Sequence, residues 1–178
     1  MKGRKFVIPA ALALLMALAV ARGGREKGSV TVTLNGKEAP VTLAEDEHVW
    51  LTVDPASVTN TEAAITLHKQ GISRIGYGDP FYIARKAHYN SREWKEVPWR
   101  GDEEPDWWAF LTIVGFCPDG GPETERQQGH WDMETEMQAD WADIYGTLEP
   151  GEYLFVKEII DPENRSAGRY IGAAFTVK

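Results

Sequence analysis

The feature of this sequence that most restricts its fold is a series of short segments in which apolar and polar residues alternate. A period of two places every second side chain on the same face, which is typical of a half-buried β-strand. Turn-forming residues separate the segments at roughly ten-residue spacing, and none has the long 3.6-residue period of an amphipathic helix. The segments expected to form strands are 29–34, 40–43, 48–55, 62–69, 81–86, 92–99, 107–116, 130–141, 152–160 and 169–178. The pattern predicts an all-β fold, an antiparallel β-sandwich of about seven to nine strands.

Three short stretches are expected to join or interrupt these strands. Asn35-Gly36 is a strong hairpin signal, so the first two strands should pair with each other. The sequence GYGDP, residues 76–80, combines several turn-forming residues and predicts a turn. A single helical turn is expected around Asp140 to Ile144.

Residues 146–153, Gly-Thr-Leu-Glu-Pro-Gly-Glu-Tyr, predict a specific kind of corner. Pro150 restricts φ and Gly151 tolerates positive φ, so the pair favours a tight turn. Tyr153 then begins a strand, where the tyrosine of an immunoglobulin-like sandwich bonds back to an upstream backbone group. Leu148 is expected to fill the core beneath that corner. We therefore predict a structural rather than a catalytic role for Leu148, Pro150, Gly151 and Tyr153.

The first 21 residues have the pattern of a secretory signal peptide. Three basic residues, Lys2, Arg4 and Lys5, precede an uncharged apolar run from Phe6 to Ala21 that ends in Ala-Val-Ala. That run is shorter than the about 20 residues a spanning helix needs. We expect a secreted or cell-surface protein that contacts the membrane only if the signal segment stays uncleaved. The predicted organisation is a signal peptide at 1–21, a flexible leader and N-terminal hairpin at 22–46, and the β-sandwich at 47–178.

The charge and the cysteine content restrict the partners and the chemistry. The formal net charge is −8, and loss of the basic signal peptide makes it more negative. An acidic surface repels phosphate backbones, so we expect no nucleic-acid partner. The single cysteine, Cys117, cannot form an internal disulfide, so the fold must rest on its apolar core, with Cys117 as a buried, inert thiol.

Motifs of catalysis and of metal binding are missing from the sequence. It contains neither a Gly-x-Ser-x-Gly elbow nor a His-Glu-x-x-His helix. The four histidines are scattered, and the acidic residues Asp132, Glu134 and Glu136 alternate along a predicted strand, as a solvated face does. We therefore expect a protein that is not an enzyme and that uses no metal or cofactor.

Seven tryptophans are the most informative candidates for ligand binding. Trp107 and Trp108 are adjacent, so on a strand they point to opposite faces and one of them is a candidate for exposure. They follow Trp99 across a loop that mixes acidic and aromatic residues, RGDEEPDWW. An exposed aromatic ring on a β-sandwich can stack on a sugar or on a protein partner. The alternative is that these tryptophans fill the core. Trp99, Trp107 and Trp108 are the candidate ligand-binding residues.

Several motifs together resemble the bacterial immunoglobulin-like domain of secreted proteins and lipoproteins from Gram-positive bacteria. They are IGYGDPFYIARK, REWKEVPW, ADWADIYGTLEPGEYLFVKEI and YIGAAFTV, and the resemblance covers about residues 47–178. It implies an extracytoplasmic immunoglobulin-like sandwich without catalytic residues, and it carries over no site. The chain departs from the pattern in two places: Arg22 stands where members often have a lipid-attachment cysteine, and the segment from Cys117 to Trp131 is longer than usual.

The expected function is therefore that of a non-catalytic, extracytoplasmic immunoglobulin-like module for binding or structural display at the bacterial surface. Its expected partner is a protein or a component of the cell envelope. The alternative is a carbohydrate-binding module that uses exposed tryptophans.

Overall fold

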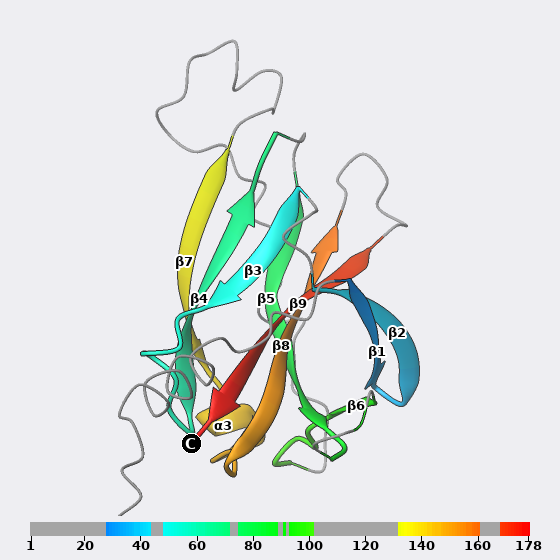
Figure 1. Ribbon diagram of the computed structural model, residues 1–178, viewed down its shortest axis with the longest axis vertical. Coiled ribbons are helices and arrows are strands. Elements are labelled where there is room, and N and C mark those ends of the chain that lie inside the picture. The colour runs from blue at the N-terminus through cyan, green and yellow to red at the C-terminus, as the bar shows by residue number, and fades with distance from the viewer. Residues whose placement is uncertain are drawn as a thin grey trace, which may run out of the picture.

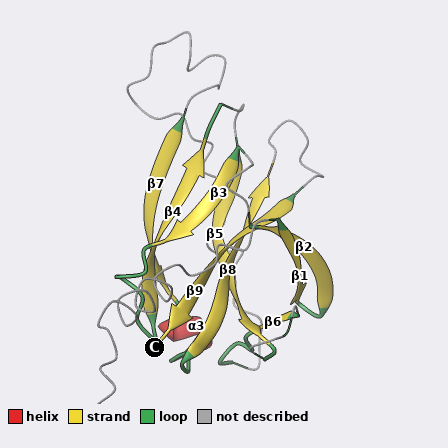
Figure 2. Cartoon of the chain, viewed as in Figure 1, coloured by secondary structure: helices red, strands yellow, loops and turns green. Residues whose placement is uncertain are grey.

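The computed structural model describes residues 28–43, 48–71, 75–88, 91, 93–101, 132–160 and 168–178. They form nine strands and one short helix: β1 (Ser29–Leu34), β2 (Lys37–Thr42), β3 (Val49–Val53), β4 (Glu62–Lys69), β5 (Gly76–Lys86), β6 (Trp94–Glu96), β7 (Met133–Asp140), α3 (Ala142–Tyr145), β8 (Gly151–Ile160) and β9 (Arg169–Val177). Figure 2 shows the predominance of strands, which confirms the predicted all-β class. The strand predicted over 107–116 lies outside the described residues.

A three-stranded antiparallel sheet packs on the antiparallel strands of a second sheet to form the sandwich (Figure 1). One has the order β3-β4-β7, and the other contains β5-β8-β9 with β6 beside β5. In an immunoglobulin fold, strands A, B and E share one sheet, whereas C, F and G share the other. The strands β3, β4, β7, β5, β8 and β9 have this arrangement, and the corner predicted at 146–153 precedes β8, the equivalent of strand F.

The main core lies between the two sheets. Alternation along β4 buries Ala63, Ile65 and Leu67, as the sequence predicts. Trp141 and Phe155 pack in the same apolar cluster. The sandwich is therefore held by apolar burial across its two layers, as expected of a chain that cannot form an internal disulfide.

An N-terminal hairpin extends the second sheet. β1 and β2 pair antiparallel around Asn35 and Gly36, as the sequence predicts. β1 also pairs with β6 and β2 with β9, each in parallel, so the strands β1-β2-β9-β8-β5-β6 close into a barrel. The predicted organisation places this hairpin with the leader, outside the sandwich, whereas in the structure it covers the second face of the β5-β8-β9 sheet.

Burial on both faces explains the composition of β8. Tyr153 and Phe155 face the main core, whereas Leu154 and Val156 belong to a second apolar cluster inside the barrel. That cluster also contains Val32, Leu34 and Val41 of the hairpin, with Ala84 and Trp94 of the sheet. A strand covered on both sides needs a continuous apolar run instead of alternation.

The expected turn at residues 76–80 is wrong. This stretch begins β5, and its pairing with β8 shifts register between Tyr77 and Phe81. Pro80 has no backbone N–H to give to the ladder, so it interrupts the pairing locally without ending the strand. The single helical turn is confirmed as α3. Among the described residues, no helix is long and apolar enough to cross a membrane.

The two tyrosines of the barrel predict a pH dependence of stability. Tyr82 and Tyr170 pack edge to face, with ring centroids 6.1 Å apart. Burial, with added repulsion from Tyr170, Glu158 and Glu96, raises the pKa of Tyr82 to about 12. The folded state thus holds this proton more tightly than the unfolded chain, so its contribution to stability is full below pH 10 and is lost as the pH rises toward 12.

Urea unfolding between pH 10 and pH 12 should therefore show a falling free energy of unfolding, with a shallower fall for Tyr82→Phe. An equal slope in the variant and the wild type would contradict this assignment.

Candidate functional site

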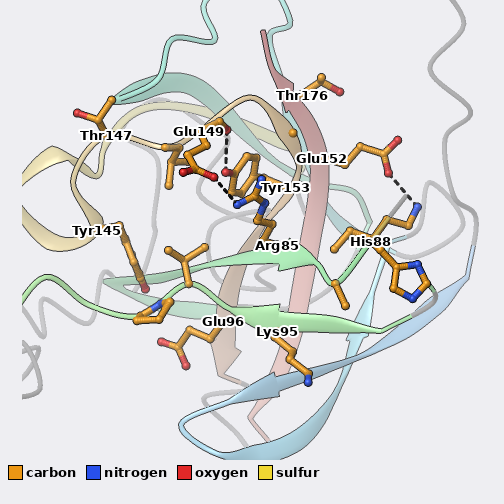
Figure 3. A pocket seen from close by; sticks show the side chains of 16 residues that line it. Arg85, His88, Lys95, Glu96, Tyr145, Thr147, Glu149, Glu152, Tyr153 and Thr176 are labelled. Carbon is orange, nitrogen blue, oxygen red and sulfur yellow. Dashed lines mark hydrogen bonds and ion pairs between the residues drawn. The ribbon is translucent and has the colours of Figure 1, made fainter. Parts of the chain in front are cut away.

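A hollow in the described surface lies beside the corner that precedes β8 (Figure 3). The cavity measures about 730 Å³ and is open to solvent. The end of β5, the strand β6 with the residues after it, the corner turn and the start of β8 form its walls. The lining includes Arg85, Lys86, Lys95, Glu96, Glu149 and Glu152, which are charged, and the imidazole of His88.

The corner itself is pinned by a hydrogen bond that a tyrosine corner typically makes. The Tyr153 hydroxyl donates to the Glu149 carbonyl oxygen at 2.8 Å. Leu148 is buried in the main core, and its N–H donates to the Asn60 carbonyl oxygen at 2.8 Å. Burial raises the pKa of Tyr153, although the Arg85 charge opposes the rise. The hydroxyl therefore stays protonated at neutral pH and acts as a donor, which matches a structural role.

The mutation Tyr153→Phe should lower the free energy of unfolding by about 0.5–1.5 kcal/mol, because it removes one hydrogen bond and keeps the ring. Chemical denaturation measures the change. Tyr170→Phe is a matched control, since no described residue hydrogen-bonds to the Tyr170 hydroxyl, and it should change stability less. Equal effects of the two substitutions would count against the corner hydrogen bond.

Two ion pairs organise the rim of the cavity. Arg85 Nη1 lies 3.0 Å from Glu149 Oε2, and Lys86 Nζ lies 3.0 Å from Glu152 Oε2. Each cation also lies over an aromatic ring, with Arg85 5.7 Å from the Tyr153 centroid and Lys86 5.4 Å from the Trp94 centroid. The Arg85–Glu149 pair is solvent-exposed and contributes little to stability, whereas the Lys86–Glu152 pair is partly buried. Their effect here is to hold two long side chains in fixed positions beside the cavity.

A second hollow of about 500 Å³ adjoins the first and contains Trp99. Asn35 and Glu96 also line it, and the Asn35 N–H donates to Glu96 Oε2 at 2.7 Å. Trp99 is half-buried and packs against the main core. Its buried Nε1 makes no hydrogen bond of good geometry to a described residue. Burial raises the pKa of Tyr145, and the Trp99 N–H nearby opposes that rise.

The candidate tryptophans have separate outcomes. Trp99 lines a hollow, but its partial burial differs from the fully exposed ring of a flat stacking platform. Trp107 and Trp108, with Cys117, lie outside the described residues. Trp94 and Trp141 fill the two apolar clusters. Of the three candidate tryptophans, Trp99 is therefore the one that lies in the described part of the chain, and it borders a hollow.

The basic residues beside the cavity were missed by the sequence analysis. A local excess of positive charge in an acidic chain could have revealed them. Between residues 85 and 100 the sequence contains Arg85, Lys86, Arg92, Lys95 and Arg100 but only Glu93 and Glu96 as acids. No catalytic or metal-binding motif accompanies this excess.

The histidine and the acidic residues of the other sheet make structural contacts. His68 Nε2 lies 2.8 Å from Thr52 Oγ1, its Nδ1 lies 3.2 Å from Glu134 Oε1, and its ring stacks on Trp50 at 5.0 Å. Asp132 accepts a hydrogen bond from the Gly71 N–H. In the described part of the chain, no three His, Cys, Asp or Glu residues are grouped as metal ligands.

The fold and its corner define an all-β sandwich with an immunoglobulin-like strand arrangement. No family model, no curated protein and no solved structure matches this chain. The resemblance to the bacterial immunoglobulin-like family therefore stays a prediction, and the function has to be argued from the geometry of the site.

Proposed function

We propose that this chain is a non-catalytic, extracytoplasmic immunoglobulin-like module that binds a protein or a cell-envelope component at the bacterial surface. The observation that carries the proposal is that the two hollows adjoin. Both are lined by Lys95, Glu96, Val97 and Pro98, so they lie along one segment of chain, and we call the two hollows together the recessed surface. A recessed surface with a few fixed polar groups is the usual form of a binding site.

The arrangement of the side chains favours binding over catalysis. Tyr145 and Tyr153 line the cavity, and burial raises the pKa of each, so their hydroxyls stay protonated at neutral pH. Arg85 and Lys86 are held by carboxylates and by ring contacts. Side chains positioned in this way before a partner arrives reduce the entropy cost of binding.

A carbohydrate-binding module is the second candidate function. The observation that favours it is the composition of the hollow at Trp99, where an indole lies among Asn35, Lys95 and Glu96. An aromatic ring offers an apolar face to a sugar, and amide, ammonium and carboxylate groups can hydrogen-bond its hydroxyls. Trp107 and Trp108 belong to this proposal through the sequence argument alone.

The test is a binding screen on the purified chain with tryptophan fluorescence as the readout. The panel contains cell-wall glycans, common polysaccharides, calcium and candidate envelope proteins. For any ligand that gives a saturable change, Lys95→Glu should weaken binding roughly tenfold or more, because it reverses a charge inside the recessed surface. Lys37→Glu is the matched control, because Lys37 is exposed and lines neither hollow.

The variants separate the two candidate functions. Loss of glycan binding in Trp99→Ala, in a variant that circular dichroism shows to be folded, supports the carbohydrate module. Binding of a protein that Lys95→Glu weakens and Trp99→Ala leaves intact supports the first proposal. A ligand whose affinity neither variant alters would place the binding site elsewhere on the chain.

A further inference from the structure

The hairpin β1-β2 packs on the sandwich much as a separately folded ligand would. Its two strands share six register pairs, from Ser29↔Thr42 to Leu34↔Lys37. Its junctions with the rest of the fold are much shorter, with two register pairs to β6 and two to β9. The hairpin is therefore held together mainly by its own ladder, whereas apolar contacts hold it on the sheet.

The hairpin and the sheet fit each other closely where their apolar side chains meet. Val32, Leu34 and Val41 are buried against Ala84, Trp94, Leu154 and Val156. Opposite Val41 the sheet has Gly172, where an added Cβ would lie 2.9 Å from Val41 Cγ1. The absence of a side chain at Gly172 thus leaves room for the hairpin. The turn is fixed by the hydrogen bond from the Asn35 N–H to Glu96 Oε2.

The chain connects this hairpin to the sandwich on one side only, through the residues between Thr42 and Val49. An undocked hairpin would leave an apolar sheet face and the open edges of β6 and β9, which are a template for another strand pair. The segment that matches this face residue for residue is the same hairpin of a second copy.

We propose that the face formed by β5, β8 and β9 is an acceptor site for a β-hairpin, and that β1-β2 can occupy it either in the same chain or in a second copy of this chain. Exchange of an identical element needs no new contacts and is a low-cost route to a dimer. The tether gives the chain's own hairpin a high effective concentration, so exchange becomes appreciable only when chains are concentrated, as in a crowded surface layer.

Complementation between two variants of the whole chain tests the proposal. In the first, Val32→Asp with Val41→Asp prevents the hairpin from docking and leaves the acceptor face intact. In the second, Leu154→Asp disables the face and leaves the hairpin intact. Each variant alone should be monomeric by light scattering, and a mixture should give a 1:1 heterodimer. Two folded variants that stay monomeric when mixed would overturn the proposal.

A crosslinking experiment tests the same proposal if the aspartate variants fail to fold. Thr33 and Lys95 are register partners across the β1-β6 junction. Thr33→Cys with Lys95→Cys, in a Cys117→Ser background, should give an intramolecular crosslink in dilute solution. After refolding at high protein concentration, a covalent dimer should appear, in a share that rises with concentration. Intramolecular crosslinks alone at every concentration would overturn the proposal.

Discussion

The mutation Trp141→Ala should lower the free energy of unfolding by about 3–5 kcal/mol, as truncation of a buried aromatic residue usually does. Trp141 is fully buried, and its ring lies 5.3 Å from that of Phe175 across the two sheets. Its Nε1 donates to the Asn60 carbonyl oxygen at 3.1 Å. Alanine would leave a large cavity next to the corner that carries Leu148, and the Asn60 carbonyl oxygen would keep only the hydrogen bond from the Leu148 N–H.

Two controls separate the causes of this loss, and chemical denaturation measures all three variants. Trp141→Phe keeps an aromatic ring and loses only the hydrogen bond and part of the volume, so it should cost less than alanine. Trp50→Ala truncates the same residue type at a half-buried position on the outer side of β3, and it should cost much less. A similar loss at both tryptophans would contradict the assignment of Trp141 to the core.

The mutation Gly172→Val should destabilise the fold by about 1–3 kcal/mol, the usual cost of overpacking. A Cβ there would lie 2.9 Å from Val41 Cγ1, 3.1 Å from the Phe155 carbonyl oxygen and 3.2 Å from Leu154 Cδ1. The Phe155 oxygen belongs to the backbone of a paired strand and cannot move aside. The easiest relief is displacement of Val41, so the hairpin β1-β2 should loosen before the sandwich does.

Hydrogen exchange of the hairpin amides, compared with the overall unfolding transition, measures whether the hairpin loosens before the sandwich unfolds. Ala174→Val is the matched control, because Ala174 follows two residues later on β9 and is exposed. It should leave the exchange of the hairpin nearly unchanged. Equal exchange of the hairpin in both variants would show that Gly172 is not required for docking.

The strands and the corner could be predicted because their causes are local. The period of two in β4 and β7, the Asn35-Gly36 turn and the Pro150-Gly151 turn each depend on neighbouring residues alone. The predicted turn at residues 76–80 is wrong for a related reason. The composition of this stretch favours a turn, but pairing with β8 keeps it extended, and the residues of the stretch do not show which strand will pair with it.

Much less of the candidate site could be predicted from the sequence. Arg85 and Glu149 are far apart along the chain, and they meet because β5 pairs with β8 just after the corner. Trp99 is a candidate ligand-binding residue because it is aromatic, yet its partial burial depends on how the chain after β6 packs against the main core. Residue type alone indicated what each side chain could do but not where it would lie.

The sequence by itself determined that this chain forms short strands, that they alternate between core and solvent, and that a tyrosine follows a tight turn, because each of these depends on backbone preference and local periodicity. Only the tertiary structure decided that the N-terminal hairpin closes the second sheet and that two hollows adjoin, one of them beside the corner. The reason is that strand partners and cavity walls come from segments distant in sequence, and their pairing is selected by the joint burial of apolar faces rather than by any one segment.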